Sequence, residues 1–185
     1  MTQHVELFRE KAVNVGAEVV SCDSVAAAAQ FIAEHIDGTL LVPAFSSARR
    51  FKLKAALKKA GIAIEVDNFR TLAIEAEAGI TGVNFAIADT GTLVLESTAE
   101  DIRLATTWPP KQFALLDPAK IVADGIEAVE PLRQFHQRDP HNYIAYITGP
   151  SRTADIERVL TIGVHGPKEL FILLVPGLSD DFMEM

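Results

Sequence analysis

The residues best suited to chemistry lie between Gly149 and Glu157, in the order Gly-Pro-Ser-Arg-Thr-Ala-Asp-Ile-Glu. They follow a strand-like run at residues 143–147, and the pattern after them is typical of a helix. A turn from a strand into a helix presents free backbone N–H groups, which together with the helix dipole favour an anion. Arg152 would add a planar cation that can bind a phosphate or a carboxylate through two hydrogen bonds. The candidate ligand-binding residues here are Gly149, Ser151, Arg152, Thr153, Asp155 and Glu157.

A purely structural explanation accounts for the same residues. Ser151 would cap the helix, and acidic residues in the first turns would complement its dipole. Arg152 and Asp155 would form an ion pair at i,i+3 spacing. Because helix N-termini commonly have this composition, spacing alone favours the structural explanation, and both readings stay open.

A second group lies at Asp89-Thr90-Gly91-Thr92, where residues 83–97 predict an antiparallel hairpin. Gly91 suits a turn position with positive φ, and one carboxylate with two hydroxyls can contact a polar ligand. A plain turn in which Asp89 accepts from nearby backbone N–H groups explains the group equally well. Arg103 follows the hairpin and can reach the Asp89 region as an ion-pair partner or as an anion ligand. The candidates from this part of the chain are Asp89, Thr90, Gly91, Thr92 and Arg103.

The third candidate is His165, in a loop with two glycines and a proline at residues 163–167. Its imidazole can act as a general base near neutral pH, although a lone loop histidine is more often a packing or hydrogen-bonding residue. If residues 152–160 form an ordinary crossover helix, Ser151 and His165 lie at opposite ends of the sheet. One site that uses both residues would then need an antiparallel last strand, a partner subunit or a bent path of the chain.

Helix and strand patterns alternate along the first third of the chain, and this alternation predicts a parallel sheet with helices on its faces. The expected fold is therefore α/β: a mixed, mainly parallel sheet flanked by helices, with an antiparallel hairpin. We expect a single domain over residues 1–185, with a helical segment at about 1–15 and an acidic tail at about 177–185, mobile or at an interface. The predicted strands are 17–21, 39–43, 62–66, 112–116, 142–148 and 170–175, and the predicted helices are 4–14, one capped by Asp23 or Ser24, 48–60, 124–137 and 152–160.

Composition excludes several classes of protein. A net charge of −8 argues against binding to nucleic acid or to an anionic membrane surface. The one cysteine, Cys22, cannot form an internal disulfide or ligate an iron–sulfur cluster. No apolar run approaches ~18 residues and no signal peptide is visible, so we expect a cytoplasmic protein without a membrane span. The histidines lack metal-ligand spacing, and we expect no metal and no cofactor.

Four segments occur together in one order, namely residues 89–96, residues 103–110, residues 149–157 and residues 163–167. Together they resemble the LUD-domain family, specifically its short lactate-utilisation protein C type, over about residues 40–176. The resemblance implies a fold similar to the NagB/RpiA/CoA-transferase group. It also implies a bacterial cytoplasmic role in oxidising L-lactate to pyruvate, together with two iron–sulfur partner proteins. It supplies no catalytic residue.

Three functions stay open at this point. The chain is an accessory subunit of a lactate-oxidising system without a redox centre of its own. Alternatively, it is an enzyme or binder for a phosphate-, carboxylate- or CoA-bearing metabolite at the strand-end cleft. The third alternative is a dimerising scaffold whose motifs only fix the fold.

Overall fold

The computed structural model describes residues 3–138, 141–153 and 161–185. A six-stranded sheet forms its centre, in the order β1-β12-β7-β4-β2-β3, and every pair of neighbours is parallel. This confirms the mixed α/β fold with a mainly parallel sheet flanked by helices. The strands are β1 (Glu18–Ser21), β12 (Glu169–Leu174), β7 (Lys111–Leu116), β4 (Ala78–Gly82), β2 (Thr39–Leu41) and β3 (Ala63–Glu65).

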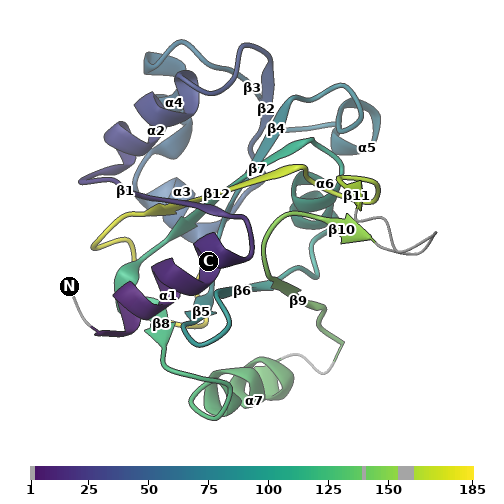
Figure 1. Ribbon diagram of the computed structural model, residues 1–185. Helices are drawn as coiled ribbons and strands as arrows, with labels where there is room; N and C mark the ends of the chain where they lie inside the picture. Colours follow the sequence, from purple (N-terminus) through teal and green to yellow (C-terminus); the bar gives the residue numbers. More distant parts are fainter. Residues whose placement is uncertain (1–2, 139–140, 154–160) are drawn as a thin grey trace.

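The central strands are nearly continuous apolar runs because both faces of the sheet are covered. One face packs against α2 (Val25–Ala33) and α4 (Leu53–Lys59), and residues such as Phe113 and Leu173 belong to that core. The other face packs against α1 (Gln3–Asn14), where Phe8 and Ile172 are fully buried. Figure 1 shows α2 and α4 together at the upper left, with α1 crossing in front of the sheet.

A second, four-stranded sheet contains the predicted hairpin. Its order is β8-β5-β6-β9, and β6 pairs antiparallel with both β5 and β9. Helix α7 (Val129–Arg138) covers it through Phe135, which stacks on Phe85 at 6.5 Å between ring centroids. In Figure 1, α7 lies at the end of the molecule away from α2 and α4. The strands are β8 (Ile121–Val122), β5 (Phe85–Ile87), β6 (Thr92–Glu96) and β9 (Ile144–Ile147).

Several helices differ from the expected ones. The predicted helix 48–60 is two helices, α3 (Ser46–Arg50) and α4, because Lys52 between them has φ 52°. Helix α7 begins at Val129 and not at residue 124. The Asp124 carboxylate accepts from the backbone N–H groups of Ile126 and Glu127, and this turn precedes the helix. Periodicity did not indicate α5 (Phe69–Leu72), α6 (Glu100–Thr107), η1 (Pro118–Lys120) or strand β4.

The segment after Gly149 is the main correction to the sequence-based fold. Arg152 and Thr153 form strand β10, which pairs antiparallel with β11 (Thr161–Ile162), so no helix begins at Arg152. The Ser151 N–H donates to the Pro167 carbonyl at 2.8 Å, and the Ser151 carbonyl accepts from Gly163 at 2.9 Å. Ser151 is therefore part of a main-chain ladder and is not a helix cap. Asp155 and Glu157 lie outside the described residues.

The acidic tail also differs from expectation. Residues 179–185 pack against the carboxyl ends of the central strands, where Ser179 is buried and residues 182–185 are half-buried. Asn84 and Lys120 donate to tail carbonyls, and Arg50 pairs with Glu184. These contacts fix the segment to the domain.

Gly149 offers a stability test of the turn that leads into β10. Its φ is +73°, and a side-chain Cβ would overlap the Val15 carbonyl after α1. Gly149→Ala should therefore lower the free energy of unfolding by about 2 kcal/mol, measured by urea denaturation. Gly125→Ala, where φ is not positive and the space is open, should change it by less than about 1 kcal/mol. Equal losses in the two variants would contradict this account of the turn.

Candidate functional site

A pocket of about 310 Å³ lies at the amino ends of β7 and β12. The end of β9, residues 148–151, the loop 165–167 and the end of α6 form its walls. Ser151 and His165 both line it, because the crossover helix that would have separated them does not begin at Arg152. They meet because the chain returns through β11 and pairs its main chain with Ser151. The lining residues with polar side chains are Thr106, Thr107, Gln112, Tyr146, Thr148, Ser151 and His165.

Gln112 is the most unusual residue of this pocket. It is only 2% exposed, and its Nε2 has no hydrogen-bond partner among the described residues. A buried amide left without a partner costs about 1–3 kcal/mol, so a ligand oxygen at this position would be favoured. Sequence reasoning missed Gln112. The available signal was the polar amide of Gln112 at the start of the otherwise apolar run 112–116. In the structure Gln112 is the second residue of β7.

A chain of hydroxyl groups connects the hairpin tip with the pocket wall. Thr92 Oγ1 donates to Thr90 Oγ1 at 2.8 Å and lies 2.8 Å from Thr148 Oγ1. Since a hydroxyl carries one proton, the Thr148 hydroxyl is then the donor to Thr92. Its proton is used, so Thr148 offers only acceptor lone pairs to a ligand. The sequence placed Thr90 and Thr92 at a candidate site but gave no link to Thr148.

The other two residues of the hairpin tip, Asp89 and Gly91, do not line the pocket. Asp89 is exposed, and its backbone N–H donates to the Ala123 carbonyl at 3.1 Å. Gly91, at φ +66°, leaves no space for a Cβ against the backbone of Lys11 and Ala12 in α1. The turn thus fits closely against α1 at Gly91, which supports the plain-turn explanation for that residue.

The two arginines that the sequence singled out point away from the pocket. Arg152 donates to the Val15 carbonyl just after α1. Arg103 does not contact Asp89. It donates to the Ser97 and Thr98 carbonyls at 2.7 and 2.6 Å, and its guanidinium lies 5.3 Å from the Tyr143 ring centroid. Among the described residues that line the pocket there is no lysine or arginine, so its chemistry suits a neutral group or a single carboxylate better than a phosphate.

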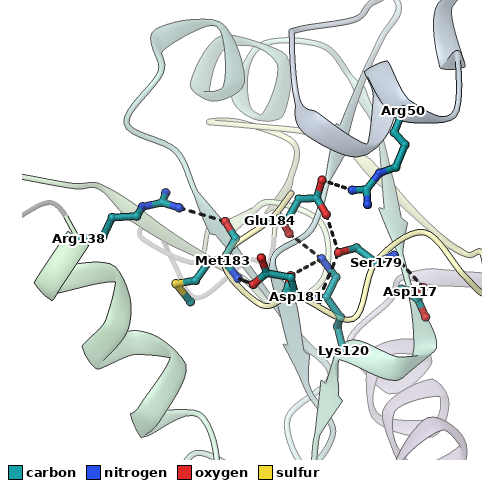
Figure 2. Close-up of polar contacts among 8 residues, drawn as sticks. All are labelled: Arg50, Asp117, Lys120, Arg138, Ser179, Asp181, Met183 and Glu184. Carbon is teal, nitrogen blue, oxygen red and sulfur yellow. Dashed lines mark hydrogen bonds and ion pairs between the residues drawn. The ribbon is translucent and has the colours of Figure 1, made fainter.

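Lys120 marks a second polar site at the opposite, carboxyl edge of the sheet, drawn in Figure 2. The residue is only 2% exposed. Burial lowers the pKa of its ammonium to about 8, although Glu184, Asp117 and Asp181 act in the other direction. Burial acts to raise the pKa of the Glu184 carboxyl. Hydrogen bonds from Arg50 and Ser179 outweigh this effect and hold its pKa below the usual value. The sequence gave no signal for Lys120, whose burial depends on distant residues.

Within the described ranges, no group of three or more His, Cys, Asp or Glu side chains is placed to hold a metal ion. In the same part of the chain, no helix combines the length and apolar character needed to span a membrane.

The family model of the LUD domain matches residues 5–175. The chain belongs to the LUD domain family. It is 30% identical over 151 residues to Lactate utilization protein C of Anoxybacillus flavithermus, an alignment that covers 79% of this chain and 67% of that protein. It is 36% identical over 103 residues to Lactate utilization protein C of Bacillus subtilis, covering 55% and 43% of the two chains.

A further relative is Uncharacterized protein NMB1437 of Neisseria meningitidis serogroup B, 38% identical over 112 residues, or 60% of this chain and 48% of that one. The chain thus spans about half the length of several of the curated relatives it matches. A crystal structure of a DUF162 family protein from Deinococcus radiodurans has the same fold, with a TM-score of 0.69 at 20% identity. That similarity covers 94% of this chain and 96% of the other.

The depressed pKa of Lys120 gives the stability of this LUD domain a pH dependence. Between about pH 8 and 10.5 the unfolded chain keeps the Lys120 proton, whereas the folded chain has released it. The Lys120 contribution therefore rises with pH across this window by up to about 3 kcal/mol, and it is lost as the pH falls through about 8. Lys120→Met should remove that rise in denaturant titrations. Exposed Lys54→Met should keep it, and a rise that persists in Lys120→Met would contradict the assignment.

Proposed function

We propose that this LUD domain acts in bacterial L-lactate utilisation, as an accessory subunit of the system that oxidises L-lactate to pyruvate. The observation that carries the proposal is the alignment with Lactate utilization protein C of Anoxybacillus flavithermus, which runs over 79% of the chain. An iron–sulfur cluster needs several cysteines, and this sequence has one. This chain would therefore hold no cluster itself, and the resemblance to the lactate-utilisation family implies that the electrons removed from lactate pass to iron–sulfur partner proteins in the cytoplasm.

Deletion of the gene tests this role. The deletion strain should fail to grow on L-lactate as its sole carbon source and should grow normally on pyruvate, because only the oxidation step is lost. A plasmid copy should restore growth. A tagged chain should recover iron–sulfur proteins from lactate-grown cells but not from cells that lack those partners. Normal growth on lactate, with no recovered partner, would refute the proposal.

The pocket at the amino ends of β7 and β12 supports a second, compatible role in binding a small hydroxy acid. The Gln112 amide can donate to a carboxylate or carbonyl oxygen, and the Thr148 oxygen can accept from a hydroxyl. L-lactate carries both kinds of group on adjacent carbons. The pocket volume of about 310 Å³ lies at the lower end of the ~300–1,000 Å³ range of ligand pockets.

His165 could add to this binding through its ring. Its side chain is exposed at the pocket, where a ring N–H can donate to a bound carboxylate. Arg152 would not take part, because its guanidinium is bound to the Val15 carbonyl. The proposal thus moves the ligand-binding role from Arg152 to Gln112.

Thermal-shift titrations with L-lactate, pyruvate and inorganic phosphate test the pocket. L-lactate should raise the Tm of the wild type more than phosphate does, and Gln112→Leu should abolish the rise because the amide donor is lost. Gln112→Leu should fold, since it replaces an unpartnered buried amide with an apolar side chain of similar size. Gln137→Leu on the exposed face of α7 is the matched control. Arg152→Ala should lower the Tm and keep the lactate shift; an undiminished shift in Gln112→Leu would exclude this site.

A further inference from the structure

The segment 179–185, here called the strap, crosses the carboxyl edge of the central sheet. Three strands end under it, and each is followed by a residue that bonds to it. Ser47, after β2, donates its N–H to the Met185 carbonyl at 3.0 Å. Asn84, after β4, donates to the Phe182 carbonyl at 3.2 Å, and the Asp117 carboxylate, after β7, accepts from the Ser179 N–H at 3.1 Å. The strap therefore covers the edge at which open α/β sheets commonly bind ligands.

Cations from three separate elements converge on the strap, as Figure 2 shows. Arg50 of α3 pairs with the Glu184 carboxylate, which also accepts from the Ser179 hydroxyl at 2.6 Å. Lys120 of η1 donates to the Glu184 carbonyl at 2.6 Å and to the Asp181 carbonyl at 3.3 Å. Arg138 of α7 donates to the Met183 carbonyl at 3.3 Å.

Arg50 is paired with a carboxylate, whereas Lys120 donates to main-chain carbonyls. The direct partners of the buried Lys120 ammonium are main-chain carbonyls, which carry only partial charge. Asp117, Asp181 and Glu184 act on it at longer range, and burial still lowers its pKa to about 8. A hydrogen bond from an ammonium to a full anion is stronger than one to a neutral carbonyl. An anion at this position would therefore satisfy Lys120 better than the strap does.

Glu184 indicates the shape of such an anion. Its side-chain carboxylate holds Arg50, and its main-chain carbonyl holds Lys120. These two groups are the ends of a five-carbon chain that runs from the carbonyl carbon through Cα, Cβ and Cγ to Cδ. A five-carbon dicarboxylate has the same skeleton, with a carboxylate at both ends.

We propose that the strap occupies a dicarboxylate site formed by Arg50 and Lys120, and that a small dicarboxylate of about five carbons displaces it. One carboxylate of the ligand takes the place of the Glu184 side chain on Arg50. The other replaces the Glu184 carbonyl on Lys120. Arg138 loses its strap carbonyl and becomes a third cation at the opened edge. This site is separate from the pocket that contains Gln112, so it does not depend on the proposed function.

Hydrogen–deuterium exchange of the full chain, with glutarate as the probe, tests the displacement. Glutarate should increase exchange in residues 179–185, because the strap leaves, and should decrease it around Lys120. Acetate at matched ionic strength should do neither, since one carboxylate can satisfy only one of the two cations. Glu184→Gln, which loses the ion pair with Arg50, should show the same displacement at an about two- to fivefold lower glutarate concentration.

Two variants establish whether the cations form the site. Lys120→Met should abolish the glutarate response, and Arg50→Ala, at an exposed position where folding is not at risk, should weaken it at least about threefold. Gln112→Leu, in the distant pocket, should leave it unchanged. Strap exchange that is unchanged by millimolar glutarate in both the wild type and Glu184→Gln would overturn the proposal. An equal effect of acetate, or an undiminished response in Arg50→Ala, would overturn it as well.

Discussion

Both polar sites depend on the parallel pairing of β7 with β12 and β4. These strands are buried on both faces, so their register is held by close packing on α1 from one side and on α2 and α4 from the other. The amino end of β7 carries Gln112 into the pocket, and its carboxyl end leads through Asp117 to Lys120. A change of register in this one strand would move both groups at once.

Helix α1 is the second constraint, because the turns recognised in the sequence pack against its last residues. Gly91 lies against Lys11 and Ala12, Gly149 lies against Val15, and Arg152 donates to the Val15 carbonyl. Gly91 and Gly149 belong to the segments that carry the family resemblance. Each must be glycine because the backbone of another segment lies too close for a side chain. This explains how a glycine-rich turn can look like an anion site in the sequence while its arginine holds a helix end. The residues left free to meet a ligand are their neighbours, Thr148 and Ser151.

The two ends of the sheet differ in their chemistry. The pocket at the amino end offers an amide donor and hydroxyl acceptors, without a lysine or arginine among its described lining residues. The carboxyl edge carries Arg50, Lys120 and Arg138 and is covered by the acidic strap. A hydroxy acid with a single carboxylate would suit the first arrangement, and a dicarboxylate would suit the second. This difference in charge would direct the two proposed ligand classes to opposite ends of the sheet.

The sequence by itself determined the class of fold and the family, because these depend on local patterns. Apolar runs such as β12 and the hairpin of β5 and β6 follow from periodicity and turn residues, and residues 149–157 and 163–167 carry the family resemblance. Tertiary structure alone decided which polar residues meet. Ser151 joins His165 because β10 and β11 form a hairpin in place of the expected helix, while Arg103 and Arg152 turn to carbonyls. The burial of Gln112 and Lys120 is set by segments distant in the chain, and no local pattern encodes which carbonyls or carboxylates will surround a side chain.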